Sequence, residues 1–146
     1  MEAGMIKEEE LPPLPDNFDY DQRETVLQKV ARRDNALIHN PILEATKNWT
    51  KNQWRYFIWN YYRYIEKVDR EIGLLLNCLE NTEYKDNTLI IFSSDHGEAA
   101  GKHQMFQKFT PYEESIKVPF AVSSLGEKMK IQKGFMDKNH FVSGVD

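Results

Sequence analysis

The residues with the clearest chemical potential lie close together in the second half of the chain. Asp95 and His96 are adjacent, and His103 and Lys108 follow within a short polar stretch. A carboxylate suits a hard divalent cation, and a neutral imidazole is a common ligand for transition metals. A metal ion, an imidazole and an ammonium group each neutralise charge that builds on a transferred oxyanion or a leaving oxygen. This set predicts a site for an ester of a tetrahedral oxyanion.

The same residues have a plainer interpretation, which their types and spacing leave open. An Asp-His-Gly sequence after a strand is more often a simple turn than a metal site, because a glycine such as Gly97 permits a sharp reversal. In that case His103 is a surface histidine and Lys108 a solvated charge. The residues alone do not decide between a turn and a site.

Two apolar runs flank this polar stretch. Residues 88–93 and 118–123 are rich in β-branched and aromatic side chains, which is typical of buried parallel strands. Pro119 fits the start of the second strand, where its missing N–H matters least. Because ligands of open α/β sheets collect beyond the carboxyl ends of strands, the stretch after Phe92 is where chemistry is expected.

A long amphipathic helix is predicted over residues 50–80. Thr50 and Gln53 resemble a capping box, and apolar residues then recur at three- and four-residue spacing up to Leu79. We expect this helix to pack on a small, mainly parallel sheet built from residues 88–93 and 118–123. Cys78 falls on the apolar face and is expected in the core. The resulting fold class is α/β.

The remaining organisation is simple. Residues 1–20 combine an acidic run with a Pro-rich stretch, and we interpret them as an extended lead-in. Residues 21–146 are then a single truncated domain. Within it, residues 21–39 are weakly helical in pattern up to the break at Asn40-Pro41.

Composition excludes several classes of protein. Nineteen Lys and Arg against 23 Asp and Glu give a net charge of −4, which argues against a nucleic-acid partner. No apolar run reaches the roughly 18–20 residues of a membrane span. One cysteine, Cys78, excludes an internal disulfide framework and any zinc site made of cysteines alone.

A resemblance to a known family favours the catalytic interpretation. The chain resembles the sulfatase family of the alkaline phosphatase superfamily over roughly residues 50–146. The resemblance is carried by Ser93-Ser94-Asp95-His96-Gly97-Glu98, Gly101-Lys102-His103, Lys108 and Tyr112-Glu113-Glu114-Ser115-Ile116-Lys117-Val118-Pro119. It implies a partial sulfatase-like α/β layer.

The resemblance also implies roles for individual residues. Asp95 and His96 would be two ligands of a divalent metal ion, usually calcium in this family. Lys108 would contact the sulfate or its bridging oxygen. His103 would lie near the same oxygens, as a hydrogen-bond donor or a proton source. The acidic pair before Ser115 is expected to be structural.

The departures from the family pattern are as informative. Family members carry a Cys- or Ser-x-Pro-x-Arg motif whose first residue becomes formylglycine, the nucleophile. Nothing here matches it, since Cys78 is followed by Leu79-Glu80. The paired acidic residues that supply further metal ligands are also missing. We therefore interpret the chain as a fragment from the C-terminal part of a sulfatase catalytic domain, inactive alone, with an incomplete calcium site.

Alternatives remain open at this point. The parent protein is expected to hydrolyse sulfate esters of a small molecule or a glycan, and the family resemblance implies an exported location for it (periplasmic, secreted or lysosomal). A phosphonate or phosphate ester hydrolase of the same superfamily shares the Asp-His-Gly and lysine pattern. A non-catalytic anion- or metal-binding module is the other reading. Unpaired sheet edges also predict self-association.

Overall fold

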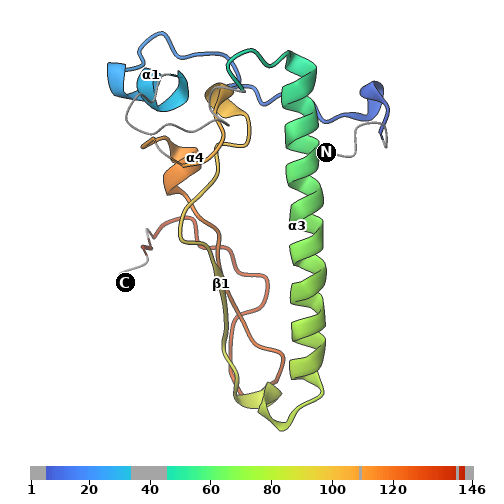
Figure 1. Cartoon of the computed structure of the whole chain (residues 1–146). Coiled ribbons are helices and arrows are strands. Elements are labelled where there is room, and N and C mark those ends of the chain that lie inside the picture. Colours follow the sequence, from blue (N-terminus) through green and yellow to red (C-terminus); the bar gives the residue numbers. More distant parts are fainter. Residues whose placement is uncertain (1–5, 34–45, 109, 141, 144–146) are drawn as a thin grey trace.

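The computed structural model describes residues 6–33, 46–108, 110–140 and 142–143. One long helix dominates it, and the shorter helices and the N-terminal segment gather around the beginning of that helix, while a narrow β-hairpin runs beside it (Figure 1). The elements in chain order are the 3-10 turn Glu8–Glu10, α1 Val26–Arg33, α3 Lys51–Glu80, the 3-10 turn Glu83–Asn87, β1 Ile90–Ser93, the 3-10 turn Lys102–Gln104, α4 Glu113–Ile116 and β2 Phe120–Ser123.

The helix predicted over residues 50–80 is confirmed as α3. The Thr50 hydroxyl accepts a hydrogen bond from the Gln53 amide at 3.2 Å, and the Gln53 side chain accepts one from the Thr50 amide at 2.7 Å. This reciprocal capping box satisfies two backbone donors that the first turn would otherwise leave unpaired. The expected start of the helix is therefore set by local sequence.

The core lies at the beginning of α3 and is aromatic. Trp54 is only 2% exposed, and its ring lies 6.0 Å from that of Phe18 and 5.0 Å from that of Trp49. Phe57 continues the cluster to Phe106, at 6.1 Å between ring centroids. Edge-to-face pairs of this kind stabilise beyond the area that they bury. Segments far apart in sequence therefore meet at one point on α3.

The N-terminal lead-in is part of this packing. It is irregular apart from the 3-10 turn, yet Leu11 and Phe18 are both buried. The Arg55 guanidinium donates to the carbonyl oxygens of Leu11 at 2.6 Å and Pro12 at 2.9 Å. Because proline cannot donate, a charged side chain bonding to carbonyl oxygens is a suitable way to fix such a segment. The described part of the lead-in thus packs on α3.

The pairing of the two strands differs from the prediction. β1 and β2 are antiparallel, with Ser93 opposite Phe120 and Ile90 opposite Ser123. A parallel pair needs a crossover that returns the chain to the starting end of the first strand. Residues 94–119 instead form a compact excursion that re-enters at the carboxyl end of β1. The expected mainly parallel arrangement is wrong for this pair. Both strands end at the expected residues, Ser93 and Ser123, and begin two residues later than expected.

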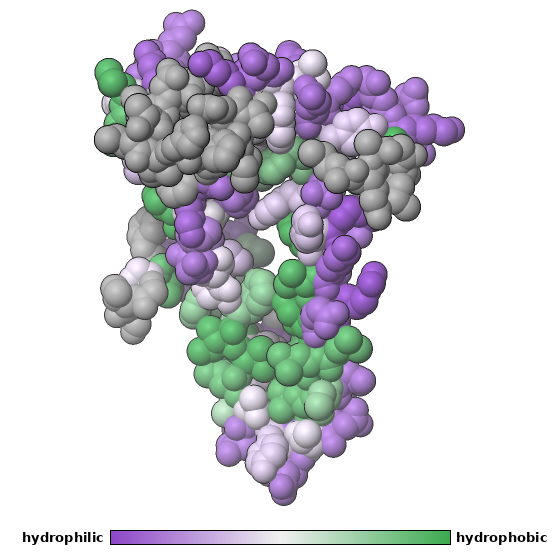
Figure 2. Space-filling view, in the orientation of Figure 1, coloured by the Kyte–Doolittle hydropathy of each residue, from purple (hydrophilic) through white to green (hydrophobic). Residues whose placement is uncertain are grey.

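The distal half of α3 and the hairpin expose their apolar side chains. Figure 2 shows apolar residues gathered in the lower part of the molecule, over these elements. The exposed side chains include Val68, Leu74 and Leu75 on α3 and Ile91, Phe92, Phe120 and Val122 on the hairpin; we call these seven residues the open apolar face. Cys78 is also exposed, which corrects its expected place in the core. The buried side chains of α3, Trp54 and Ile58, belong to its first turns.

No helix among the described residues combines the length and the apolar composition that crossing a membrane requires.

Two isoleucines of α3 test this uneven packing. Ile58 is 2% exposed and Ile65 is 48% exposed. We expect Ile58→Ala to lower the free energy of unfolding by about 2–5 kcal/mol, because it leaves a cavity in the core. Ile65→Ala, the matched control, should change it by well under half as much. Urea denaturation of dilute protein, followed by circular dichroism, measures both; equal losses would contradict the described core.

Candidate functional site

The turn after β1 brings Asp95 and His96 to the carboxyl end of the strand, as the sequence predicted. Gly97 follows and lies against the backbone of α4. Its amide donates to the Ser115 carbonyl oxygen at 2.8 Å, and a Cβ at this position would lie 1.9 Å from the Glu114 carbonyl oxygen. Any other residue would push α4 away. The glycine is therefore what allows α4 to fix the direction in which the chain leaves β1.

The contacts of His96 determine which of its ring nitrogens is available. Nδ1 lies 2.8 Å from the Gly97 carbonyl oxygen, an acceptor, so this nitrogen carries the hydrogen. In the neutral ring Nε2 is then the acceptor. It contacts the Lys108 ammonium and lies 3.4 Å from Oδ2 of Asp95. Three of the four predicted site residues, Asp95, His96 and Lys108, thus meet.

The surroundings of Asp95 favour the charged form of its carboxyl. Desolvation would raise the pKa of its carboxyl, but His96, the backbone amides of the turn and Lys108 together lower it below its usual value. The side chain is 81% exposed, so solvent screens much of this effect. The carboxylate is nonetheless held in its charged form, which is the form that binds metal.

Asp95 and His96 also have the spacing of neighbouring metal ligands. Two donors about 2.3–2.6 Å from one ion, at roughly a right angle, lie about 3.3–3.7 Å apart. The observed 3.4 Å between Oδ2 and Nε2 falls in that range. Within the described ranges, however, no three His, Cys, Asp or Glu side chains group together. The two residues fit a divalent cation but supply only part of the six to eight ligands that calcium takes.

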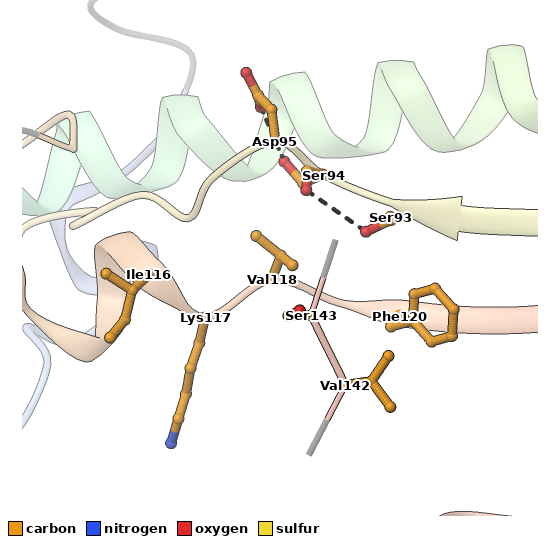
Figure 3. Close-up of a pocket in the computed structure, with 9 residues that line it drawn as sticks. All are labelled: Ser93, Ser94, Asp95, Ile116, Lys117, Val118, Phe120, Val142 and Ser143. Carbon is orange, nitrogen blue, oxygen red and sulfur yellow. Dashed lines mark hydrogen bonds between the residues drawn. The ribbon is translucent and has the colours of Figure 1, made fainter. Parts of the chain in front are cut away.

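A cavity of about 560 Å³ opens beside Asp95 at the end of the hairpin. Figure 3 shows its polar side, formed by Ser93 and Ser94 where β1 ends, facing apolar side chains from the second strand and its approach. The lining is Ser93, Ser94, Asp95, Ile116, Lys117, Val118, Phe120, Val142 and Ser143. Its position beyond a strand end is typical of ligand sites in α/β proteins.

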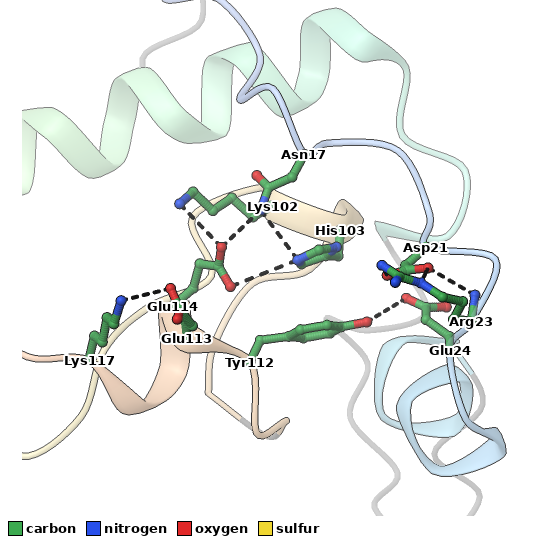
Figure 4. A network of polar contacts seen from close by, with 10 residues as sticks. All are labelled: Asn17, Asp21, Arg23, Glu24, Lys102, His103, Tyr112, Glu113, Glu114 and Lys117. Carbon is green, nitrogen blue, oxygen red and sulfur yellow. Dashed lines mark hydrogen bonds and ion pairs between the residues drawn. The ribbon is translucent and has the colours of Figure 1, made fainter.

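His103, the fourth predicted residue, lies in a different environment. Its ring stacks on Tyr112 at 4.0 Å between centroids. Its Nε2 lies 3.4 Å from Nδ2 of the Asn17 side chain and 3.8 Å from the Glu114 carboxylate (Figure 4). The backbone amide of His103 donates to the backbone carbonyl oxygen of Asn17 at 2.8 Å. These contacts connect the loop after β1 to the N-terminal lead-in.

Glu114 is the centre of this second cluster. Its side chain is 12% exposed and accepts hydrogen bonds from Asn17 at 2.8 Å and Lys102 at 3.3 Å. Partial burial would raise its pKa, but its own backbone amide, Asn17 and Lys102 outweigh that and lower it. Sequence reasoning treated Glu114 as structural and assigned no role to Asn17. Nothing in the Pro-rich lead-in marks Asn17, because its partners come from the other end of the chain.

Comparison with known proteins identifies the family. The family model of the sulfatases matches residues 15–145. The chain belongs to the sulfatase family. An arylsulfatase of Clostridium perfringens is 40% identical over 74 residues, which are 51% of this chain and 15% of that protein. A Delta 4,5-hexuronate-2-O-sulfatase of Bacteroides thetaiotaomicron is 28% identical over 121 residues, 82% of this chain and 24% of that one.

Solved sulfatase structures share the fold. A 2-O glycosaminoglycan sulfatase superposes with a TM-score of 0.67 and 26% identity, covering 83% of this chain and 26% of that protein. A crystal structure from Bacteroides thetaiotaomicron, assigned to the sulfatases, gives a TM-score of 0.70 and 28% identity, covering 87% of this chain and 26% of the other. The expected sulfatase-like α/β fold is confirmed. The chain spans about a quarter or less of the length of these relatives.

The lowered pKa of Glu114 predicts an acid-dependent loss of stability. A carboxyl with a folded-state pKa below its unfolded value stabilises the fold above the unfolded pKa, near 4.5, and loses that contribution as pH falls toward the folded pKa. We expect the urea midpoint of the wild-type chain to fall between pH 5 and pH 3 more steeply than that of Glu114→Gln. Glu113→Gln removes an exposed carboxylate and should behave like wild type. Parallel curves for all three proteins would contradict the prediction.

Proposed function

We propose that this chain contributes the metal-binding turn and the oxyanion-binding lysine of a sulfate ester hydrolase. The observation that supports the proposal is the meeting of Asp95, His96 and Lys108 at the carboxyl end of β1. A carboxylate, an imidazole nitrogen and an ammonium group together suit a cation and the anion that it binds. Membership of the sulfatase family supports the same reaction.

Each side chain has a defined part in the proposed site. Asp95 and His96 would hold calcium, which supplies positive charge opposite the sulfate oxygens when it is bound. The Lys108 ammonium would contact the sulfate or the bridging oxygen and offset the charge of the leaving alkoxide. His103, which the resemblance places near the same oxygens, contacts Tyr112, Asn17 and Glu114 instead. His103 is therefore not proposed as the donor of a proton to the leaving oxygen.

The proposal assigns no nucleophile to this chain. The sequence has no Cys- or Ser-x-Pro-x-Arg motif from which formylglycine forms in the family. Among the residues that the structure describes, two metal ligands come together, and two ligands hold calcium weakly. We therefore propose that the 146 residues bind the anion and the cation but do not turn over a sulfate ester by themselves.

The names of relatives support a sulfated glycan as the substrate class of the complete enzyme. One relative is a Delta 4,5-hexuronate-2-O-sulfatase and one solved relative is a 2-O glycosaminoglycan sulfatase. Another is an ulvan-active sulfatase, 41% identical over 68 residues. The cavity beside Asp95 combines hydroxyl groups with apolar walls, which suits the two faces of a sugar ring.

Binding without turnover tests this function. In a titration with calcium and an aryl sulfate, we expect the NMR signals of His96 and Lys108 to shift while no phenol is released. Asp95→Asn should weaken calcium binding, and Lys108→Ala should weaken sulfate-ester binding by about tenfold, the effect of one charge-assisted hydrogen bond. Lys128→Ala, which removes an exposed lysine that is paired with Asp86 and does not line the cavity, is the matched control.

Three outcomes would count against the proposal. An absence of shifts at His96 and Lys108 would remove the binding site. Turnover that Lys108→Ala destroys would show that the chain has a nucleophile after all. Tighter binding of an aryl phosphate than of the aryl sulfate would favour phosphoryl chemistry.

We also propose that the chain associates with itself through the open apolar face. A two-stranded sheet is marginal alone, and its unpaired edges and exposed apolar side chains favour pairing with another chain. We expect light scattering to show a mass that rises with concentration. Leu75→Lys with Ile91→Lys should shift the protein toward monomer, whereas Leu27→Lys, on exposed α1, should not. A monomer at high concentration would refute this.

A further inference from the structure

Lys108 follows a loop whose backbone is unusually strained. Ala100, His103, Gln104 and Gln107 all have positive φ, between 47° and 72°, although none is glycine. Such conformations cost on the order of 1–2 kcal/mol per residue and persist only where the surroundings fix them. Something must therefore hold this loop in place, and the function proposed above does not use it.

The Glu98 carboxylate is the group that holds the loop closed. One of its oxygens, Oε1, accepts a hydrogen bond from the Gln107 amide at 2.6 Å and another from the Ala100 amide at 3.2 Å. Both donors are among the residues with positive φ. A charged acceptor shared by two backbone amides is a strong and directional contact. A single side chain thus connects the start of the loop to its end.

The same loop end is fixed from its other side. The Gln107 carbonyl oxygen accepts from the Ala99 amide at 3.1 Å. The N–H and the carbonyl of Gln107 are therefore both bonded, and its carbonyl lies in the peptide plane that leads into Lys108. Ala99 and Met105, each 4% exposed, pack together beneath this closure. Because the peptide plane between Gln107 and Lys108 is held, the backbone of Lys108 has a fixed position. Its exposed side chain extends from that position to His96.

The loop that Glu98 closes also contacts α3. A Cβ at Gly101, whose φ is +92°, would lie 3.0 Å from Cδ1 of Ile58, so a side chain here would require Ile58 to shift. The loop is thus packed on a rigid element on one side and closed by Glu98 on the other.

We propose that Glu98 is a positioning residue, which sets the place of Lys108 relative to Asp95 and His96 by closing the loop between them. The proposal rests on the proposed function in one respect, namely that Lys108 binds the sulfate oxygens. The closure itself depends only on the contacts of Glu98. Removing the carboxylate frees the Gln107 N–H and leaves the Ala99–Gln107 hydrogen bond to hold the end of the loop, so the position of Lys108 is less firmly fixed.

Three substitutions separate positioning from simple loss of stability. Glu98→Ala removes the acceptor. Glu98→Gln keeps a carbonyl oxygen at the same reach and should restore the closure. Thr50→Ala removes the cap of α3, which destabilises the fold and leaves the hydrogen bonds of Glu98 in place.

The readouts are amide hydrogen exchange at Ala100 and Gln107, the nuclear Overhauser effect between the Lys108 side chain and the His96 ring, and titration with inorganic sulfate. In Glu98→Ala we expect the two amides to exchange on the order of tenfold faster or more, the Overhauser effect to disappear and sulfate affinity to fall by about tenfold. Glu98→Gln should stay within about twofold of wild type, and Thr50→Ala should keep the Overhauser effect.

Persistence of the Overhauser effect in Glu98→Ala, or its equal loss in Thr50→Ala, would overturn the proposal. If Glu98→Ala does not fold, Glu98→Asp takes its place, because it withdraws the carboxylate by one methylene. It should show the same losses. Wild-type behaviour of Glu98→Asp would also overturn the proposal. Failure of the wild-type chain to bind sulfate would refute the proposed function alone, because exchange and the Overhauser effect report the closure without any ligand.

Discussion

The burial of Trp54 in the first turns of α3 is the constraint on which the described fold depends. Its indole packs against Phe18 from the lead-in and Trp49 from the approach to the helix. Its neighbour Phe57 extends the cluster to Phe106 from the loop after β1. Short segments with little regular structure cannot bury enough apolar area among themselves to offset their conformational entropy. Packing on a preformed helix face lets each of them become ordered at a smaller cost.

Features encoded by neighbouring residues could be read from the sequence. The start of α3 follows from Thr50 and Gln53, whose contacts span three residues, and the place of Asp95 and His96 follows from the apolar run that ends at Ser93. The direction of strand pairing could not be read in this way. Val, Ile and Phe suit either direction, and the choice depends on the path of residues 94–119.

Features that depend on distant contacts were missed for the same reason. Asn17 and Glu114 are 97 residues apart, and their hydrogen bond exists only because the lead-in packs on α3. Cys78 occupies an apolar stripe of α3, but a stripe predicts burial only where another element covers it. Of the candidate site, the sequence identified the chemistry of Lys108 and His96 but not Glu98, since a glutamate in a polar loop looks like any solvated charge.

The closed loop also has a geometric consequence for the two long arms of the molecule. α3 and β1 diverge from the turn at Glu83–Asn87, and residues 94–106 reconnect the tip of β1 to the beginning of α3. Ile58 is the last buried residue of the helix. Beyond it some 22 residues extend about 33 Å, so that a tilt of about 5° at the clamped end moves the far end by about 3 Å. A small change of angle at the buried end of α3 is therefore amplified at its exposed end.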